Sequence, residues 1–188
     1  MNKLSQLNIQ NKNLVIRVDM NVPIKDGAIK DETRIHACMP TIRYALNRGA
    51  KVLLVSHLGR PTEGVFDKSF SLAPVAKCLS IILSEDVDLI TQINDPLVFN
   101  GSSNIQILEN IRFFDGEKAN SDDLGKSLGA LGDIYVFDAF GVAHREQAST
   151  HSAIKNSRET CAGILLDKEI ESLTNALNES ENPYTAVI

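Results

Sequence analysis

The chain has 188 residues, with 19 lysines and arginines against 24 aspartates and glutamates and a formal net charge of −5. This length suits one domain, and 43% hydrophobic residues are enough for a sizeable core, so a disordered chain is excluded. The acidic balance and an aromatic content of 5% argue against a nucleic-acid partner, and no apolar run approaches the roughly 18 residues of a membrane helix.

Short apolar runs alternate with amphipathic stretches along the chain. In chain order, the pattern predicts a strand at 14–18, a helix at 31–47, a strand at 51–55, a helix at 71–83, strands at 87–90 and 104–108, a helix at 122–131, a strand at 134–137, a helix at 167–177 and the start of a strand at 184–188. Strands joined by single helices pair in parallel, and the helices cover both faces of the sheet. We therefore expect a single α/β domain over residues 1–188, a three-layer, doubly wound, Rossmann-like fold with a mainly parallel six-stranded sheet.

The two ends of the chain carry further expectations. Residues 1–13 are polar and lack an apolar signal segment, and the three cysteines form no Cys-x-x-Cys pair, so we expect a cytoplasmic protein. Residues 184–188 are apolar, whereas natural termini usually lie at the surface. We therefore expect a domain cut from a longer protein; the alternative is an edge strand that happens to be last.

Charged side chains follow the predicted strands at the points where those strands end. In an open parallel sheet these carboxyl ends share one edge, where ligands bind. Four arginines and two histidines are expected there: Arg34, Arg60, Arg112, Arg145, His57 and His144. Arginine makes forked hydrogen bonds to phosphate or carboxylate, so the group indicates a small, multiply charged anion, with Asp19 and Asn21 placed to meet a hydroxyl. The alternative is a set of solvated or carboxylate-paired arginines that share one edge by chance.

Metal and nucleotide motifs are absent from the sequence. Gly125-Lys126-Ser127 is similar to the end of a phosphate-binding loop, but Asn120 stands where that loop needs a glycine. His36 and Cys38 lie two positions apart on a predicted helix and therefore face different ways. No Gly-x-Ser-x-Gly segment supplies a serine nucleophile. We expect neither a metal site nor a nucleotide site in this chain.

Five segments at the predicted edge resemble the phosphoglycerate kinase family in residue type, order and spacing. They are residues 17–23 (RVDMNVP), 31–35 (DETRI), 56–61 (SHLGRP), 108–113 (LENIRF) and 138–145 (DAFGVAHR). The resemblance runs from about residue 14 to residue 188. It implies one half of a glycolytic enzyme with two α/β domains, which transfers a phosphoryl group between 1,3-bisphosphoglycerate and ADP to give 3-phosphoglycerate and ATP.

The resemblance also implies partners and cofactors. The chain looks like the N-terminal domain, which holds the phosphoglycerate, while Mg-ADP or Mg-ATP would bind a C-terminal domain that is absent here. We therefore expect a monomeric fragment that binds 3-phosphoglycerate or 1,3-bisphosphoglycerate and is inactive alone. One alternative is a non-catalytic module that binds a phosphorylated metabolite. Another is an interaction domain whose arginines meet an acidic partner surface.

Roles for single residues follow from the same resemblance. The residues that would grip the phosphate that is not transferred, together with the loop positions between them, are His57, Leu58, Gly59, Arg60, Arg112 and Arg145. Asp19 and Asn21 would meet the hydroxyl and carboxyl end of the substrate. Arg34 would lie nearest the transferred group and is the expected catalytic residue. Arg17, inside a strand, and Asp138, bracing the loop of Arg145, are expected to be structural.

Overall fold

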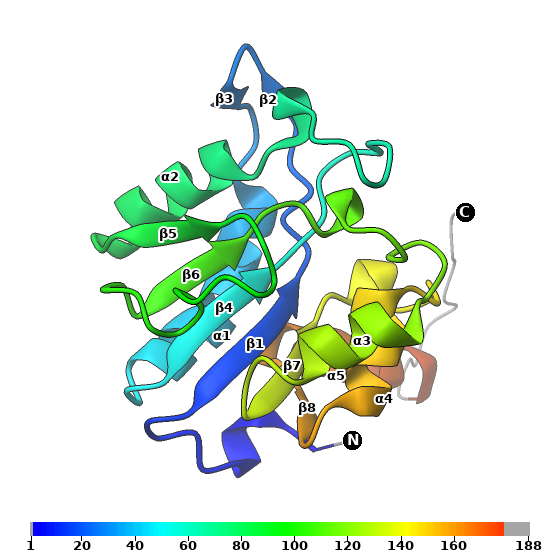
Figure 1. The fold of residues 1–188 in the computed structure, drawn as a ribbon. Coiled ribbons are helices and arrows are strands. Elements are labelled where there is room, and N and C mark those ends of the chain that lie inside the picture. The colour runs from blue at the N-terminus through cyan, green and yellow to red at the C-terminus, as the bar shows by residue number, and fades with distance from the viewer. Residues whose placement is uncertain (1, 179–188) are drawn as a thin grey trace.

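The structure is a computed structural model that describes residues 2–178, and its centre is one sheet of six strands (Figure 1). In spatial order the strands are β5 (Val87–Ile90), β6 (Ile105–Leu108), β4 (Lys51–Val55), β1 (Asn13–Val18), β7 (Ile134–Asp138) and β8 (Thr160–Ala162). Every pairing between neighbouring strands is parallel. From β1 the chain builds one side of the sheet and then crosses to β7 and β8, so the strand order reverses at β1.

Helices cover both faces of the sheet. They are α1 (Thr33–Leu46), α2 (Ala73–Leu83), α3 (Asp122–Gly129), α4 (Ala153–Asn156) and α5 (Ile164–Asn178). Residues of α1 and α2 share one hydrophobic cluster with alternate residues of the central strands, and residues of α3 and α4 share the other. α5 packs against α1 and β7. The expected three-layer α/β/α fold is thus confirmed, and burial on both faces explains the continuous apolar runs in the strands.

The sixth strand of the sheet differs from the expected one. The sequence pattern places it at 184–188, a segment that lies outside the described residues, whereas the structure forms β8 at the edge beside β7. β8 has only three residues, too few for a periodic pattern to reveal. Its Cys161 and Ala162 are buried because they pack beside β7.

A small antiparallel hairpin also lies outside the predicted elements. It joins β2 (Ile24–Lys25) to β3 (Ala28–Ile29) through Asp26 and Gly27, which both have positive φ, 55° and 74°. This Asp-Gly turn is a favoured two-residue hairpin connection. Short turns complete the fold: η1 (Leu4–Gln6), η2 (Lys68–Phe70), η3 (Ile111–Phe113), η4 (Phe140–Val142) and a π-helix, η5 (Ala148–Ser152).

None of the helices within residues 2–178 is both long enough and apolar enough to span a membrane. Over the same residues, His, Cys, Asp and Glu side chains form no group of three or more that could hold a metal ion.

Candidate functional site

The carboxyl ends of β1, β4, β6 and β7 lie level at one edge of the sheet. Arg17 pairs with Val55, and Val18 pairs with Asp138, so the three central strands end together. The segments that follow, 19–21, 56–60, 109–112 and 139–145, therefore meet there. We call the group of Arg34, Arg60, Arg112 and Arg145 with His57 the arginine edge.

The loop after β1 is tied to its neighbours by Asp19 and Asn21. The Arg34 guanidinium forms an ion pair with Asp19, and more than half of the Arg34 side chain (54%) stays exposed. Asn21 Oδ1 accepts a hydrogen bond from the backbone N–H of Gly59 at 2.9 Å, and the Asn21 N–H donates to Asp19 Oδ1 at 3.2 Å. Because its oxygen is engaged, the amide of Asn21 has only its N–H groups to offer a ligand.

The loop after β4 depends on a glycine. Gly59 has φ +58°, and a Cβ there would lie 2.3 Å from Cε1 of Phe70, so both the backbone and the space require glycine. Asn110 holds the same loop, accepting from Leu58 N–H at 3.1 Å and donating to the Leu58 carbonyl at 2.7 Å. Leu58 and Gly59 therefore shape the turn that presents Arg60, which is exposed.

Arg112, in η3, is a buried cation with incomplete partners. It is 5% exposed; its Nη1 donates to the Gly59 carbonyl, and its Nε has no hydrogen-bond partner among the described residues. Burial, followed by the charges of Arg145 and Arg17, lowers the pKa of Arg112. A buried charge without a full set of partners is costly, so an anion at Nε would stabilise this arrangement.

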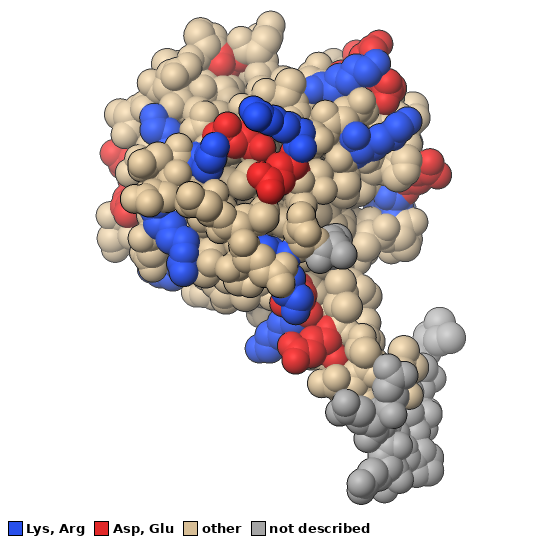
Figure 2. Space-filling view, turned by 90° about the horizontal axis from the view of Figure 1, so that it is seen from below, with Lys and Arg blue, Asp and Glu red and all other residues tan. Residues whose placement is uncertain are grey.

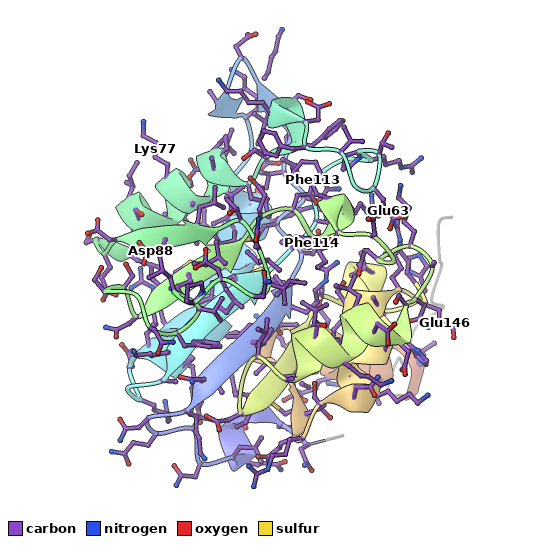
Figure 3. The ribbon with its side chains drawn as sticks, in the orientation of Figure 1. Glu63, Lys77, Asp88, Phe113, Phe114 and Glu146 are labelled. Carbon is purple, nitrogen blue, oxygen red and sulfur yellow. The ribbon has the colours of Figure 1, made fainter. Side chains whose placement is uncertain are left out.

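η3 is braced by an aromatic pair beside the arginine edge. The ring of Phe113 lies 5.4 Å from that of Phe66, centroid to centroid, at an angle of 58°. Phe113 and Phe114, labelled in Figure 3, mark the loop that carries Arg112 away from the end of β6.

His57 lies among the arginines and is uncharged. It is 4% exposed, and burial followed by the charges of Arg17, Arg112, Arg145 and Arg34 lowers its pKa to about 2. A neutral imidazole binds through the direction of its N–H rather than through charge.

The loop after β7 presents Arg145, which is half-buried, and leaves His144 exposed. The charge of Arg145 lowers the pKa of both His57 and Arg112, and the charge of Arg60 lowers the pKa of Arg112. The charges of Arg112, Arg145 and Arg34 thus bear on His57, and that of Arg60 bears on Arg112, at the edge where the central strands end level.

Asp138 does not brace this loop as the sequence led us to expect. Its Oδ1 accepts from the Leu166 N–H at 2.9 Å, so it holds the first turn of α5 instead. Gly163 allows this approach, because a Cβ there would lie 2.2 Å from Asp138. A carboxylate that can reach two loops cannot be assigned to either from its position in the sequence.

The sequence predicts a structural role for Arg17 but does not identify its partners beneath the edge, Ser149 and Glu117. Arg17 is fully buried; its Nε donates to Ser149 Oγ at 2.9 Å, and that hydroxyl donates to Glu117 Oε1 at 2.6 Å. Glu117 is fully buried too, and burial raises its pKa while Arg17 opposes the shift. The one signal for this network was a charged residue inside an apolar strand, which needs buried partners.

The opposite end of the sheet shows no such concentration of one charge. Seen from below, lysines and arginines lie interspersed with aspartates and glutamates over the surface (Figure 2). The face seen in Figure 2 therefore carries no cluster of cations like that of the arginine edge.

Fold and edge together define a doubly wound α/β protein with a candidate site for a small anion. The family model for phosphoglycerate kinase matches residues 4–188, and the chain belongs to the phosphoglycerate kinase family.

Curated relatives and solved structures agree with this assignment. The chain is 47% identical to a phosphoglycerate kinase of Nitratidesulfovibrio vulgaris over 186 residues, which are 99% of this chain and 47% of that protein. The structure of phosphoglycerate kinase from Coxiella burnetii matches with a TM-score of 0.87 at 44% identity, over 96% of this chain and 46% of that one. The Pyrococcus horikoshii enzyme matches with a TM-score of 0.84 at 33% identity, over 97% and 47%. The chain thus spans about half the length of these relatives.

Proposed function

We propose that this chain supplies the phosphoglycerate site of a phosphoglycerate kinase, which transfers a phosphoryl group between 1,3-bisphosphoglycerate and ADP to give 3-phosphoglycerate and ATP. The observation that carries the proposal is buried Arg112, whose Nε lacks a partner among the described residues at an edge lined by further arginines. A phosphate oxygen there would accept from Nε and balance the charge. The non-transferred phosphate would be held by His57, Arg60, Arg112 and Arg145.

The rest of the substrate would lie toward the loop after β1. Asp19 accepts hydrogen bonds as a carboxylate and would meet the substrate hydroxyl, and the free N–H groups of Asn21 would meet its carboxyl end. Leu58 and Gly59 would contribute by shaping the loop, since the N–H of each already bonds an asparagine.

Arg34 is the proposed catalytic residue. Its guanidinium is paired with Asp19, and its side chain is 54% exposed against 17% for that of Asp19. It would face the transferred phosphoryl group and stabilise the negative charge spread over that group's oxygens. Because such transfer needs little covalent chemistry from protein, positioning and charge are the contributions this chain makes.

The segment whose sequence is similar to the end of a phosphate-binding loop does not fit a Mg-nucleotide. Gly125, Lys126 and Ser127 lie on α3, where Lys126 pairs with Asp122 at 2.7 Å. A Cβ at Gly125 would lie 2.4 Å from that of Ser152, so this glycine serves helix packing. We propose that Mg-ADP and Mg-ATP bind in the half of the relatives' length that this chain does not span, and that the chain alone is a cytoplasmic monomer that binds substrate without turnover.

Calorimetric titration tests the proposal. We expect 3-phosphoglycerate to bind, with an affinity that falls as salt rises because the contacts are ionic, and Mg-ATP to give no heat of binding. Arg158 is exposed and precedes the amino end of β8, at the opposite end of the strands from the edge, so it supplies the control variant Arg158→Ala, which should bind like the wild type. Failure of 3-phosphoglycerate to bind at low salt would contradict the proposal for this chain.

A coupled assay tests the second part. Phosphoryl transfer from ATP to 3-phosphoglycerate should be undetectable with the purified chain, because no nucleotide phosphate site is proposed here. Turnover that persists through a further purification step would show that a nucleotide site exists in this chain.

A further inference from the structure

Arg17 is the one arginine near the edge that does not face it. It is the penultimate residue of β1, fully buried, on the same face of the sheet as Val15 and Tyr135. Its guanidinium is held by named acceptors: Nε bonds Ser149, and Nη1 bonds the Val18 carbonyl. The remaining nitrogen, Nη2, lies 3.4 Å from Nδ1 of His57.

The chemistry of this last contact decides where the proton of His57 sits. A guanidinium carries only N–H donors and cannot accept a hydrogen bond. A proton on Nδ1 would therefore point at another N–H, whereas a lone pair on Nδ1 accepts from Nη2. In a neutral imidazole, an accepting Nδ1 leaves the proton on Nε2.

We infer that Arg17 is a positioning residue that holds His57 as the Nε2–H tautomer, so that the ring presents a fixed donor to the anion at the arginine edge. The identity of that anion rests on the proposed function; the tautomer does not. The arginines of the edge supply charge, and His57 supplies one directed hydrogen bond.

Arg17 can hold this place because its own charge is matched below the edge. Ser149 lies between Arg17 and Glu117: its Oγ accepts from Arg17 and donates to one Glu117 oxygen, and its N–H donates to the other at 2.9 Å. The Tyr135 hydroxyl donates to the Ser149 carbonyl at 2.6 Å. Each nitrogen of the Arg17 guanidinium and each oxygen of the Glu117 carboxylate has at least one partner, which holds the guanidinium in one orientation.

The groups around His57 keep it neutral as well as oriented. Burial lowers its pKa most, and the cations of Arg17 (β1), Arg112 (η3), Arg145 (the loop after η4) and Arg34 (α1) add to the shift. An imidazolium would place a further positive charge among these arginines. Neutrality is therefore consistent with an Nδ1 lone pair that meets Arg17.

Nitrogen-15 NMR of the histidine-labelled protein tests the tautomer directly, without ligand. The His57 signals are assigned by their loss in His57→Gln, and exposed His36 on α1 serves as an internal reference. We expect Nδ1 of His57 to be unprotonated and Nε2 protonated throughout pH 5–8. A proton on Nδ1, or conversion to imidazolium in that range, would overturn the inference.

A double variant tests whether Arg17 is the cause. Arg17→Met with Glu117→Gln removes both buried charges together, so that neither is left unpaired. We expect His57 to become a mixture of tautomers in this variant and affinity for 3-phosphoglycerate to fall roughly tenfold, while Arg158→Met leaves both unchanged. An unaltered, pure Nε2–H tautomer in the folded double variant would remove Arg17 from this role; if the variant does not fold, the wild-type spectrum still decides the tautomer.

Two isosteric variants distinguish a directed hydrogen bond from His57 from the mere filling of space by its ring. An asparagine amide overlies Nδ1 of histidine, and a glutamine amide overlies Nε2, so His57→Gln should keep much more of the 3-phosphoglycerate affinity than His57→Asn. Equal losses would show that the ring merely fills space. Absence of 3-phosphoglycerate binding in the wild type, together with the expected tautomer, would contradict the proposed function while leaving this inference standing.

Discussion

The buried arginines differ in the groups that balance their charge. Arg17 has a partner for its charge in Glu117, bridged by Ser149, whereas Arg112 is flanked by further cations. A buried charge without a partner costs roughly several kcal/mol, and a buried charge that is paired costs much less. Arg17 is therefore expected to act within the fold and Arg112 through a ligand.

Arg60 gives the most direct test of a single contact. It is exposed, and so its replacement leaves no buried partner unsatisfied. We expect Arg60→Ala to weaken 3-phosphoglycerate binding by about 1.5–3 kcal/mol, the usual range for a hydrogen bond to a charged group, with unchanged unfolding in urea. Titration calorimetry measures the affinity, with Arg158→Ala as the matched control. An affinity equal to that of the wild type would remove Arg60 from the site.

The loop after β4 links three parts of the fold. Asn21 reaches it from β1, Asn110 from β6, and the ring of Phe70 closes over Gly59. These contacts place Arg60 and the carbonyl that binds Arg112, so the loop has one conformation imposed from three sides.

Gly59→Ala should therefore destabilise the protein in two ways. The positive φ costs about 1–2 kcal/mol for any other residue, and the clash with Phe70 adds to it. Gly27→Ala is the control for strain alone, since it has φ +74° and open space around its Cβ. In urea unfolding, Gly59→Ala should lower the free energy of unfolding more than Gly27→Ala does. In a Phe70→Ala background, where the clash is absent, Gly59→Ala should cost less than it does in the wild type. Equal losses at the two glycines would show that the Phe70 contact carries no energy.

The sequence predicts those helices and strands whose apolar and polar residues form a recognisable pattern. β4 and β5 have the expected bounds, and β4 shows the reason most clearly because it is a short, nearly continuous apolar run. β8 and the hairpin around Gly27 are too short to show a period, although the Asp-Gly pair is a recognisable turn signal. The strand expected at 184–188 lies outside the described residues.

The candidate site was predictable where loops alone determine it. Parallel strands end at a common edge, so the places of Arg60, Arg112 and Arg145 follow from the order of the elements. The support beneath that edge does not follow, because Ser149 contacts Arg17 across 132 positions of sequence. No local pattern encodes such a distant pairing; it needs the strand order reversal at β1.

The stability of the whole molecule should depend on pH through His57. Its pKa is about 2 when folded and 6.5 when free, so below about pH 6.5 the unfolded chain binds a proton that the folded chain does not. Stability from this group is therefore present above pH 6.5 and falls by about 1.4 kcal/mol for each pH unit below it. Urea unfolding should show a loss between pH 7.5 and pH 5 that is smaller by roughly 2 kcal/mol in His57→Gln.

Other buried groups act in the opposite sense and do not obscure this difference. Burial raises the pKa values of Glu117, Asp138 and Glu169, so their contribution is lost as the pH rises through those values. They are present in both proteins, and comparison of wild type with His57→Gln removes them. Identical pH dependence in the two proteins would show that His57 is protonated equally in the folded and unfolded states.

The central place of β1 has a consequence for the time course of folding. β1 is among the first elements to be synthesised, yet it pairs with β7, where Ile134 lies opposite Leu14. The hydrogen bond from Arg17 to Ser149 likewise cannot form until Ser149 has been synthesised. Contacts so far apart in sequence make folding slow, because the entropy cost of closing a long loop precedes the favourable energy of the contacts. A nascent chain that has not yet exposed residue 149 holds an unmatched cation in its first strand. We therefore expect the contacts beneath the arginine edge to form late, after β7 and Ser149 have been synthesised.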